Sequence, residues 1–454
     1  MKAHLAIFII LVLLFSCNNS SFHKKEAERY FDEKKYDNAL IEINKAIESE
    51  PDSISHYVLR FLIFDLTGRY KEEISDLDKI IKLNKKNKSK PLNAYNQRAV
   101  AKMQLGLYKE ALLDINYFIE NRDTVGNLIE AYLNKASILF KLNDFKNSEK
   151  VYELVLSENN GKDKSIESQA LIGLANMSKS PKDALKLLNK AIAIDDNCAT
   201  AYGGRGGIYM DLGKIDLAFD DFKKAISINN TNDINMANLY FNMGQLFANY
   251  KNNNDSATKY FEKAIRLTPQ SSNNDMIYLN LAVIKQKVGK LNDALNDYKK
   301  AEAINPQNDL LLYNFALLLS DLNRNIEALE KINKAICINP NDADYFSTKG
   351  TILTALSSFK EAVTEYKKAI KINPNSGGAF YNLGYLYGKE NNHEQSIRYY
   401  NKAVLLNFNL KATLVNRALE KIEINKISSA CADLKKAYSL GRTDITPLIE
   451  KYCK

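Results

Sequence analysis

Residues 294–306 read ALNDYKKAEAINP, and the same pattern returns at 328–340 as ALEKINKAICINP and at 362–374 as AVTEYKKAIKINP. Each stretch has an alanine, a large side chain four residues later, a second alanine after three more residues, and a proline five residues beyond it. Steps of three and four residues place these side chains on one helix face, and a following proline favours the end of that helix. The three stretches begin at equal intervals, at Ala294, Ala328 and Ala362, which indicates a tandem repeat.

The repeat extends toward both ends of the chain. Its interval is constant from Ala301 onward and is equal or slightly longer before it, so we expect the extra residues to lie in turns. The poorest copies are residues 53–86 and 165–198, and in the second of these we expect a short leading helix that Ser180-Pro181 ends. The second alanine or its replacement recurs at 46, 80, 118, 155, 191, 225, 264, 301, 335, 369, 403 and 437.

Another helix is predicted upstream of each of these helices. There a large residue precedes a small one by four positions, as in Tyr240/Gly244 and Phe380/Gly384, and a glycine such as Gly289 often follows as a helix end. A small residue lets two helices approach closely. The whole pattern resembles the tetratricopeptide repeat. This resemblance implies an all-α fold, an α-solenoid that forms a right-handed superhelix of about 12 helix–turn–helix repeats.

The pattern divides the chain into five parts. We expect a leader at residues 1–16 and a tether at 17–22. Degenerate repeats follow at 20–198, and regular repeats at 199–442. Residues 443–454 are predicted to form a C-terminal capping helix, because a solenoid needs a terminal element with one polar face.

The leader has a basic start at Lys2 and an uninterrupted apolar run at residues 5–15, which is too short to span a bilayer comfortably. It ends in Leu14-Phe15-Ser16-Cys17 and resembles a bacterial lipoprotein signal, although Phe15 departs from the usual small residue. The resemblance implies that Cys17 becomes the acylated N-terminus and attaches the protein to a membrane. The alternative is an ordinary secreted protein that is cleaved near Cys17. We therefore expect a bacterial cell-envelope protein on the periplasmic side of the inner or outer membrane, with the cell surface as another location.

Two cysteines lie near the C-terminus. Cys431 and Cys453 would form a disulfide in an exported protein and attach the final helix, residues 445–452, to the last repeat. The alternative is a pair of free thiols. Gly441 is expected to end the preceding helix, and Asp444 to cap the final one.

The sequence lacks the signs of a catalytic, metal or nucleic-acid site. The four histidines are scattered, no His or Cys pair has the spacing of metal ligands, and no nucleotide-binding or hydrolase motif occurs. The net charge of +9 is spread along the chain without a basic stripe. We expect no enzyme activity, no cofactor, no small-molecule substrate and no nucleic-acid partner.

The candidate binding residues lie two positions before the small residue of each first helix. That offset of about 200° places them opposite the small residue, facing the groove of the solenoid. Carboxamides can donate and accept hydrogen bonds at once, and could therefore hold a peptide backbone. The row is similar to the asparagine ladder of protein O-GlcNAc transferase, but it also fits a solvated repeat consensus. The residues are Asn134, Asn242, Asn280, Asn314, Asn382 and Asn416, with Tyr313, Tyr381 and Tyr385 beside them as an aromatic patch.

These features predict a non-enzymatic scaffold that binds a protein or an extended peptide along the groove. One alternative is a factor for outer-membrane protein or pilus assembly. Another is a nutrient-binding lipoprotein, which the absence of tryptophan disfavours.

Overall fold

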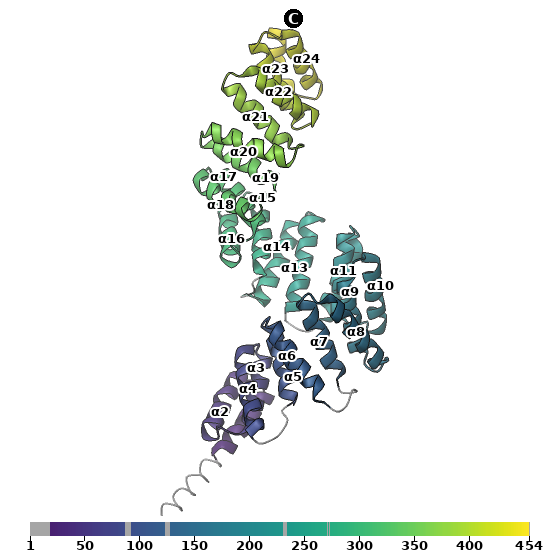
Figure 1. Ribbon diagram of the computed structural model, residues 1–454. Helices are drawn as coiled ribbons and strands as arrows, with labels where there is room; N and C mark the ends of the chain where they lie inside the picture. The colour runs from purple at the N-terminus through teal and green to yellow at the C-terminus, as the bar shows by residue number, and fades with distance from the viewer. Residues whose placement is uncertain are drawn as a thin grey trace, which may run out of the picture. The chain divides into compact units, whose positions relative to one another are not determined.

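The computed structural model describes residues 19–86, 92–122, 128–229, 234–269, 271 and 273–453. No strand occurs among these residues, and the helices follow one another in pairs (Figure 1). The described helices form twelve such pairs and one terminal helix. The predicted all-α solenoid of about twelve helix–turn–helix repeats is therefore confirmed.

The chain divides into two compact units, residues 1–230 and 231–454, which are described separately. In the first unit, a helix at residues 19–32 pairs with α2 (Tyr36–Ser49). The later pairs of this unit are α3 (Ile54–Leu66) with α4 (Tyr70–Lys86), α5 (Leu92–Gln104) with α6 (Tyr108–Glu120), α7 (Ile129–Lys141) with α8 (Phe145–Asn159), α9 (Lys164–Met177) with α10 (Pro181–Ile194), and α11 (Ala199–Asp211) with α12 (Ile215–Ile228).

The second unit contains six pairs and the C-terminal helix. They are α13 (Ile234–Asn249) with α14 (Asn254–Leu267), α15 (Asn274–Lys287) with α16 (Leu291–Ile304), α17 (Asp309–Asp321) with α18 (Asn325–Ile338), α19 (Ala343–Ala355) with α20 (Phe359–Ile372), α21 (Gly377–Lys389) with α22 (His393–Leu405), α23 (Leu410–Glu423) with α24 (Ile427–Ser439), and then the 3-10 turn η2 (Thr443–Ile445) and α25 (Thr446–Tyr452).

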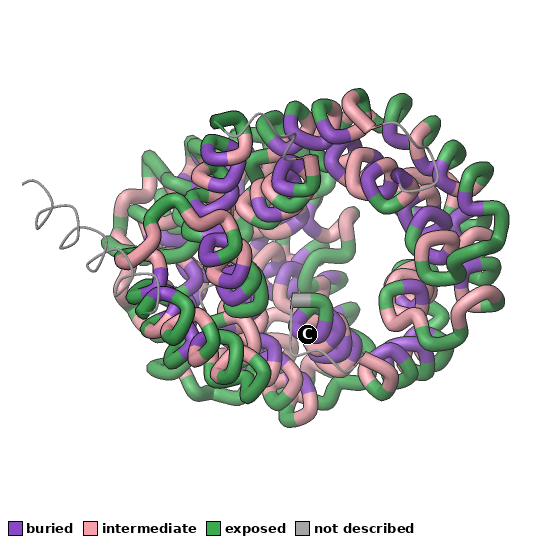
Figure 2. Tube along the Cα trace, turned by 90° about the horizontal axis from the view of Figure 1, so that it is seen from below, coloured by how far each residue is buried: buried purple, intermediate pink, exposed green. Residues whose placement is uncertain are grey.

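The small residue of a first helix provides the space into which the aromatic residue of the second helix fits. Tyr400 of α22 is almost fully buried against Gly384 of α21, where an added Cβ would come within 2.8 Å of the ring. Gly244 and the buried Phe261 repeat this arrangement, with a corresponding distance of 2.5 Å. Buried and exposed residues alternate along each helix (Figure 2), so the hydrophobic core extends along the repeats.

Consecutive first helices lie closer together than consecutive second helices. In the second unit, α13, α15, α17, α19 and α21 each contact the next first helix, whereas the second helices make no comparable contacts with one another. Because only the first helices contact one another from repeat to repeat, they form the inner face of the unit. The same holds for α5, α7, α9 and α11 in the first unit.

Left-handed residues separate the two helices of most pairs. Gly106, Gly213 and Gly289 have φ between +70° and +77°, as a glycine at a helix end requires. Asparagine takes the same role at Asn323 and Asn391, with φ of +57° and +60°. Asparagine tolerates this conformation better than other non-glycine residues.

Three local predictions were wrong. Helix α9 has 14 residues and is not short, because Ser180 caps the following helix and Pro181 occupies its first turn, where no N–H is needed. Residues 19–22, expected in the tether, are helical, and Ser20 is buried. Asp444 does not cap the final helix but bonds to the Arg442 guanidinium at 2.8 Å.

The leader and Cys17 lie outside the described residues, so their predictions remain expectations. Within the described part of the chain, no helix combines the length and hydrophobicity that crossing a membrane requires.

Candidate ligand-binding surface

The inner face of the second unit carries a continuous set of accessible side chains. The set consists of the side chains two residues before and one residue after each small residue. One of them, Thr351, also forms a hydrogen bond of 3.1 Å with the Tyr366 hydroxyl of the paired second helix. All of these side chains are exposed or half-buried, and none is charged. We call this set the inner stripe: Asn242, Gln245, Asn280, Val283, Asn314, Leu317, Thr348, Thr351, Asn382, Tyr385, Asn416 and Leu419.

The second helices present a different surface. On α20 the exposed residues include Lys360, Glu361, Lys367, Lys368 and Lys371. In the same repeat, α19 contributes only Thr348 and Thr351 to the inner stripe, and both are uncharged. Charge is therefore concentrated on the second helices, and the inner stripe offers carboxamides, hydroxyls and apolar groups.

The asparagines of the inner stripe are partly engaged in the fold. Asn280 and Asn314 each donate a hydrogen bond of 2.8 Å to the carbonyl four residues earlier, at Met276 and Leu310. Asn416 donates at 2.9 Å to the Tyr381 hydroxyl of the preceding repeat. These contacts fix the orientation of each carboxamide, and a fixed donor–acceptor group loses less entropy when a ligand binds.

The three tyrosines predicted as an aromatic patch have different environments. Tyr385 is 41% exposed and belongs to the inner stripe. Tyr313 packs against the Tyr345 ring at 4.9 Å, and Tyr381 packs edge-on against the Tyr400 ring at 5.7 Å. Tyr313 and Tyr381 therefore join neighbouring helices, and only Tyr385 offers an open ring.

The first unit holds the remaining predicted position. Asn134 on α7 is half-buried, and Gln97 at the equivalent place on α5 is exposed. Both belong to the first unit, whereas the inner stripe lies on the second.

The sequence analysis missed a recurring buried ion pair. In four repeats an arginine forms a two-pronged contact with a buried aspartate of the following helix. It directly precedes the small residue in three of them and Phe61 in α3. The Arg60 guanidinium donates to both Asp76 oxygens at 2.8 and 2.6 Å, and to Asn44 of the preceding repeat at 2.6 Å. This contact raises the pKa of Arg60. The other pairs are Arg98–Asp114, Arg205–Asp221 and Arg417–Asp433.

These arginines therefore join repeats and do not bind ligands from the inner face. The sequence did carry a signal for them, because the interval from the arginine to its aspartate is the same in all four repeats.

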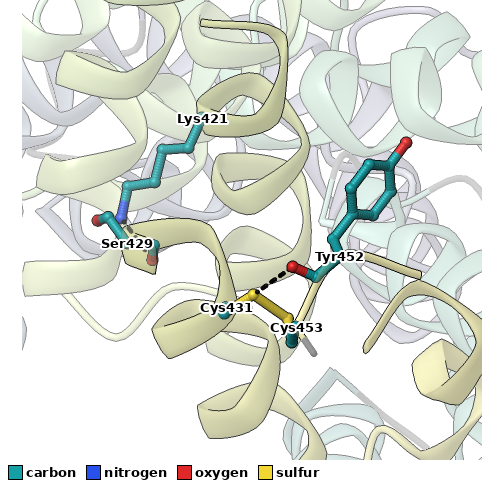
Figure 3. The surroundings of a disulfide bond; sticks show 5 residues. All are labelled: Lys421, Ser429, Cys431, Tyr452 and Cys453. Carbon is teal, nitrogen blue, oxygen red and sulfur yellow. Dashed lines mark hydrogen bonds between the residues drawn. A yellow bond between two sulfur atoms is a disulfide. The ribbon is translucent and has the colours of Figure 1, made fainter. Parts of the chain in front are cut away.

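At the C-terminus, Cys431 and Cys453 form a disulfide with 5.4 Å between their Cα atoms, the same pair that the sequence suggested. Figure 3 shows Cys431 beside the main chain of the final helix, with its sulfur 3.2 Å from the Tyr452 carbonyl oxygen. The bond attaches α25 to α24, where Leu448 and Ile449 pack against the last hydrophobic cluster.

No group of three or more His, Cys, Asp or Glu side chains in the described residues has a geometry that could hold a metal ion. The candidate site is the inner stripe, which consists of neutral side chains.

Comparison with known proteins places these repeats in a family. Models of the tetratricopeptide repeat match residues 197–270, and also 129–161, 277–308 and 377–410, while a TPR-repeat model matches 350–391.

Among curated proteins, the chain is similar to a TPR repeat-containing protein of Methanocaldococcus jannaschii, with 24% identity over 54% of this chain and 50% of that one. It is also similar to a DnaJ protein P58IPK homolog of Arabidopsis thaliana, with 24% identity over 60% and 52% of the two chains. The chain thus spans about half the length of these relatives. Among solved structures, a chain of the APC/C hetero-tetramer Cut9–Hcn1 aligns over 96% of both chains with a TM-score of 0.47 and 14% identity.

Proposed function

Because this chain is built from tetratricopeptide repeats, a type of repeat that serves as a protein-interaction scaffold, we propose that it binds an extended peptide segment of a partner protein along the inner stripe. The chain acts by holding its partner, without chemical conversion. The binding segment of the partner is poor in charge.

The neutrality of the inner stripe is the observation that supports this proposal. Its twelve residues carry no charge, although a quarter of the chain is charged and α20 exposes Lys367, Lys368 and Lys371. A charged ligand would leave its charge unpaired on such a surface, which is unfavourable once water is excluded. An extended peptide instead offers N–H and C=O groups that match carboxamides.

The repeat geometry fits an extended ligand better than a compact one. Carboxamides occur in five of the six repeats along the row of first helices, as Asn280, Asn314 and Asn382 show, and the α19 repeat carries threonines instead. Backbone groups recur along an extended chain in the same linear way. The apolar side chains of Leu317, Tyr385 and Leu419 lie between them and would contact alternate side chains of the peptide.

We further propose that this scaffold works in the bacterial cell envelope, held by acyl groups on Cys17. The support is the leader, with Lys2, the apolar run at 5–15 and the cysteine that follows it. Radiolabelled palmitate should enter the wild-type protein and should not enter Cys17→Ala. Labelling of Cys17→Ala at the wild-type level would contradict the anchor.

A site-specific photo-crosslinker tests the location of binding. Placed at Leu419 on the inner stripe, it should capture a partner from cells. Placed at Thr364, which is exposed on α20 of the same unit, it should not. Equal capture from both positions would contradict the inner stripe as the binding surface.

A triple variant tests the carboxamides. Asn280→Ala, Asn314→Ala and Asn382→Ala together should greatly reduce capture at Leu419. The matched control removes three carboxamides from the second helices, with Asn292→Ala, Asn296→Ala and Asn333→Ala, and should leave capture unchanged. Salt should have little effect on this interaction, because charge pairs do not carry it.

A further inference from the structure

The first unit contains a cavity where its row of first helices is interrupted. Helices α5, α7, α9 and α11 contact one another in succession, whereas α3 and α5 make no comparable contact. At this place the structure has a cavity of about 560 Å³. This volume lies in the range of sites that bind small ligands or single large side chains.

An exchange of small and large side chains contributes to this cavity. The position that holds glycine or alanine in regular first helices is Phe61 in α3, and the usual aromatic of the second helix is Leu77 in α4. Phe61 is only half-buried and lines the cavity, while Leu77 is fully buried. The floor of the cavity is therefore apolar, formed by Ile54, Val58, Phe61, Ile80 and Leu92.

The rim of the cavity carries polar groups from α5 and from the end of α6. Asn93 and Gln97 are exposed carboxamides on α5, and Arg122 follows the last turn of α6. The Arg122 guanidinium lies 5.0 Å from the Phe118 ring centre, and no carboxylate of the described residues forms an ion pair with it. It differs in this from Arg60 and Arg98, each of which is held by a buried aspartate.

We propose that this cavity binds one large apolar side chain of a partner peptide, and that Arg122 pairs with a carboxylate of the same peptide next to that side chain. The occupant follows from the two parts of the site. An apolar floor takes a hydrocarbon side chain, and a guanidinium that forms no ion pair with the described residues can take a carboxylate. Asn93 and Gln97 lie where they can bond the peptide backbone. This inference rests on the proposed scaffold function and adds a second, charge-dependent anchor to it.

The carboxylate can be an acidic side chain or a chain terminus, and two labelled peptides distinguish these sources. The first is Gly-Ser-Gly-Phe-Asp-Gly-Ser with an amidated end. The second is Gly-Ser-Gly-Ser-Gly-Phe with a free end. Fluorescence anisotropy with the full chain should detect binding of at least one of them, and replacing its Phe by Ala should weaken binding roughly tenfold or more.

Removal of the carboxylate should have a similar effect. Asp→Asn in the first peptide, or amidation of the second, should weaken binding roughly tenfold. In Arg122→Gln this difference should disappear. Lys82→Gln on α4 removes the same charge from a side chain outside the cavity and should keep the difference. The affinity of the wild type should also fall as salt increases.

A second variant fills the cavity directly. Val58→Trp should abolish binding of both peptides, while circular dichroism shows that the helices remain. The proposal is overturned if neither peptide binds better than its Ala version, or if Arg122→Gln keeps the carboxylate preference. Partner capture by the crosslinker at Leu419 distinguishes this proposal from the scaffold proposal. That capture should persist in Arg122→Gln, because it depends on the inner stripe alone.

Discussion

The repeat of α3 and α4 and the repeat of α19 and α20 have nearly the same length but opposite packing. In the second, Gly350 receives the ring of Tyr366, which is 1% exposed, and an added Cβ would lie 2.7 Å from that ring. In the first, Phe61 stands in place of the glycine and Leu77 in place of the tyrosine. A large residue therefore stands on the first helix of the first repeat, and a leucine replaces the aromatic ring on its second helix.

The two repeats also differ in the charged residues next to these packing positions. Arg60 and Asp76 form a bidentate contact in the first repeat, whereas Lys349 and Glu365 lie 3.4 Å apart in the second, with one Glu365 oxygen unpaired. Apolar side chains at facing positions can therefore differ in size and placement, while a buried charge needs a partner of specific geometry.

Loss of the buried acid should show the largest difference between the two repeats. Asp76→Ala leaves Arg60 without its partner and should lower the free energy of unfolding by about 3–4 kcal/mol. Glu365→Ala should cost about 1 kcal/mol, because its contacts with lysine are single and partly exposed. Urea unfolding measures both values, and hydrogen exchange assigns each loss to its repeat. Equal losses of stability in the two variants would contradict the proposed difference between the two acidic residues.

The next largest change in stability is expected when the packing residues are exchanged. Gly350→Phe should destabilise the second repeat by about 3 kcal/mol, because the new ring overlaps Tyr366. Adding Tyr366→Leu reproduces the arrangement of the first repeat and should recover part of the loss. If the double variant is no more stable than Gly350→Phe alone, then the leucine at position 77 does not explain how the first repeat accommodates Phe61.

A single glutamate gives the first repeat a specific pH dependence. Glu73 is buried at a position that is alanine in the second repeat, Ala362, and burial raises its pKa to about 8. Since the folded protein binds this proton more tightly than the unfolded chain, stability is greatest below about pH 4.5 for this group and falls as pH rises through 8.

Wild type should therefore lose about 4 kcal/mol relative to Glu73→Gln between pH 5 and pH 9, in urea unfolding at each pH. Ala362→Glu should introduce the same dependence into the second repeat. Parallel pH profiles of wild type and Glu73→Gln would show that the Glu73 carboxyl does not titrate in this range.

The smallest effect on stability is expected on the inner stripe. Asn280→Ala and Asn382→Ala should each change the free energy of unfolding by less than about 0.5 kcal/mol, because accessible side chains contribute little to folding. Their effect should appear in partner capture instead. A loss above about 2 kcal/mol at either site, which is the size expected for a buried contact, would make these asparagines structural residues.

Much of the fold follows from local sequence rules. Helix positions depend on residues such as Ala301 and Pro306, whose spacing has a direct steric meaning, and the groove positions follow from counting two residues back from Gly384 to Asn382. Such rules fail where the partner is distant in sequence. The contacts of Arg98 with Asp114 and Asp78 join three helices, and only the folded structure shows them.

The cavity could not be predicted from the sequence for a similar reason. Phe61 stands out at a small-residue position, but the opening depends on how far α5 lies from α3. A residue pattern does not specify that distance.

The disulfide also has a mechanical consequence. In a solenoid each repeat is held mainly by its neighbours, so a pulled chain peels from an end. Force on the C-terminus passes through Cys453 to Cys431 in α24, and α25 bears none of it. At the other end, the first helix is held by noncovalent contacts such as the hydrogen bond of 3.0 Å from Ser20 to Glu50. Under tension, the N-terminal end should yield first and the C-terminal end should keep its shape.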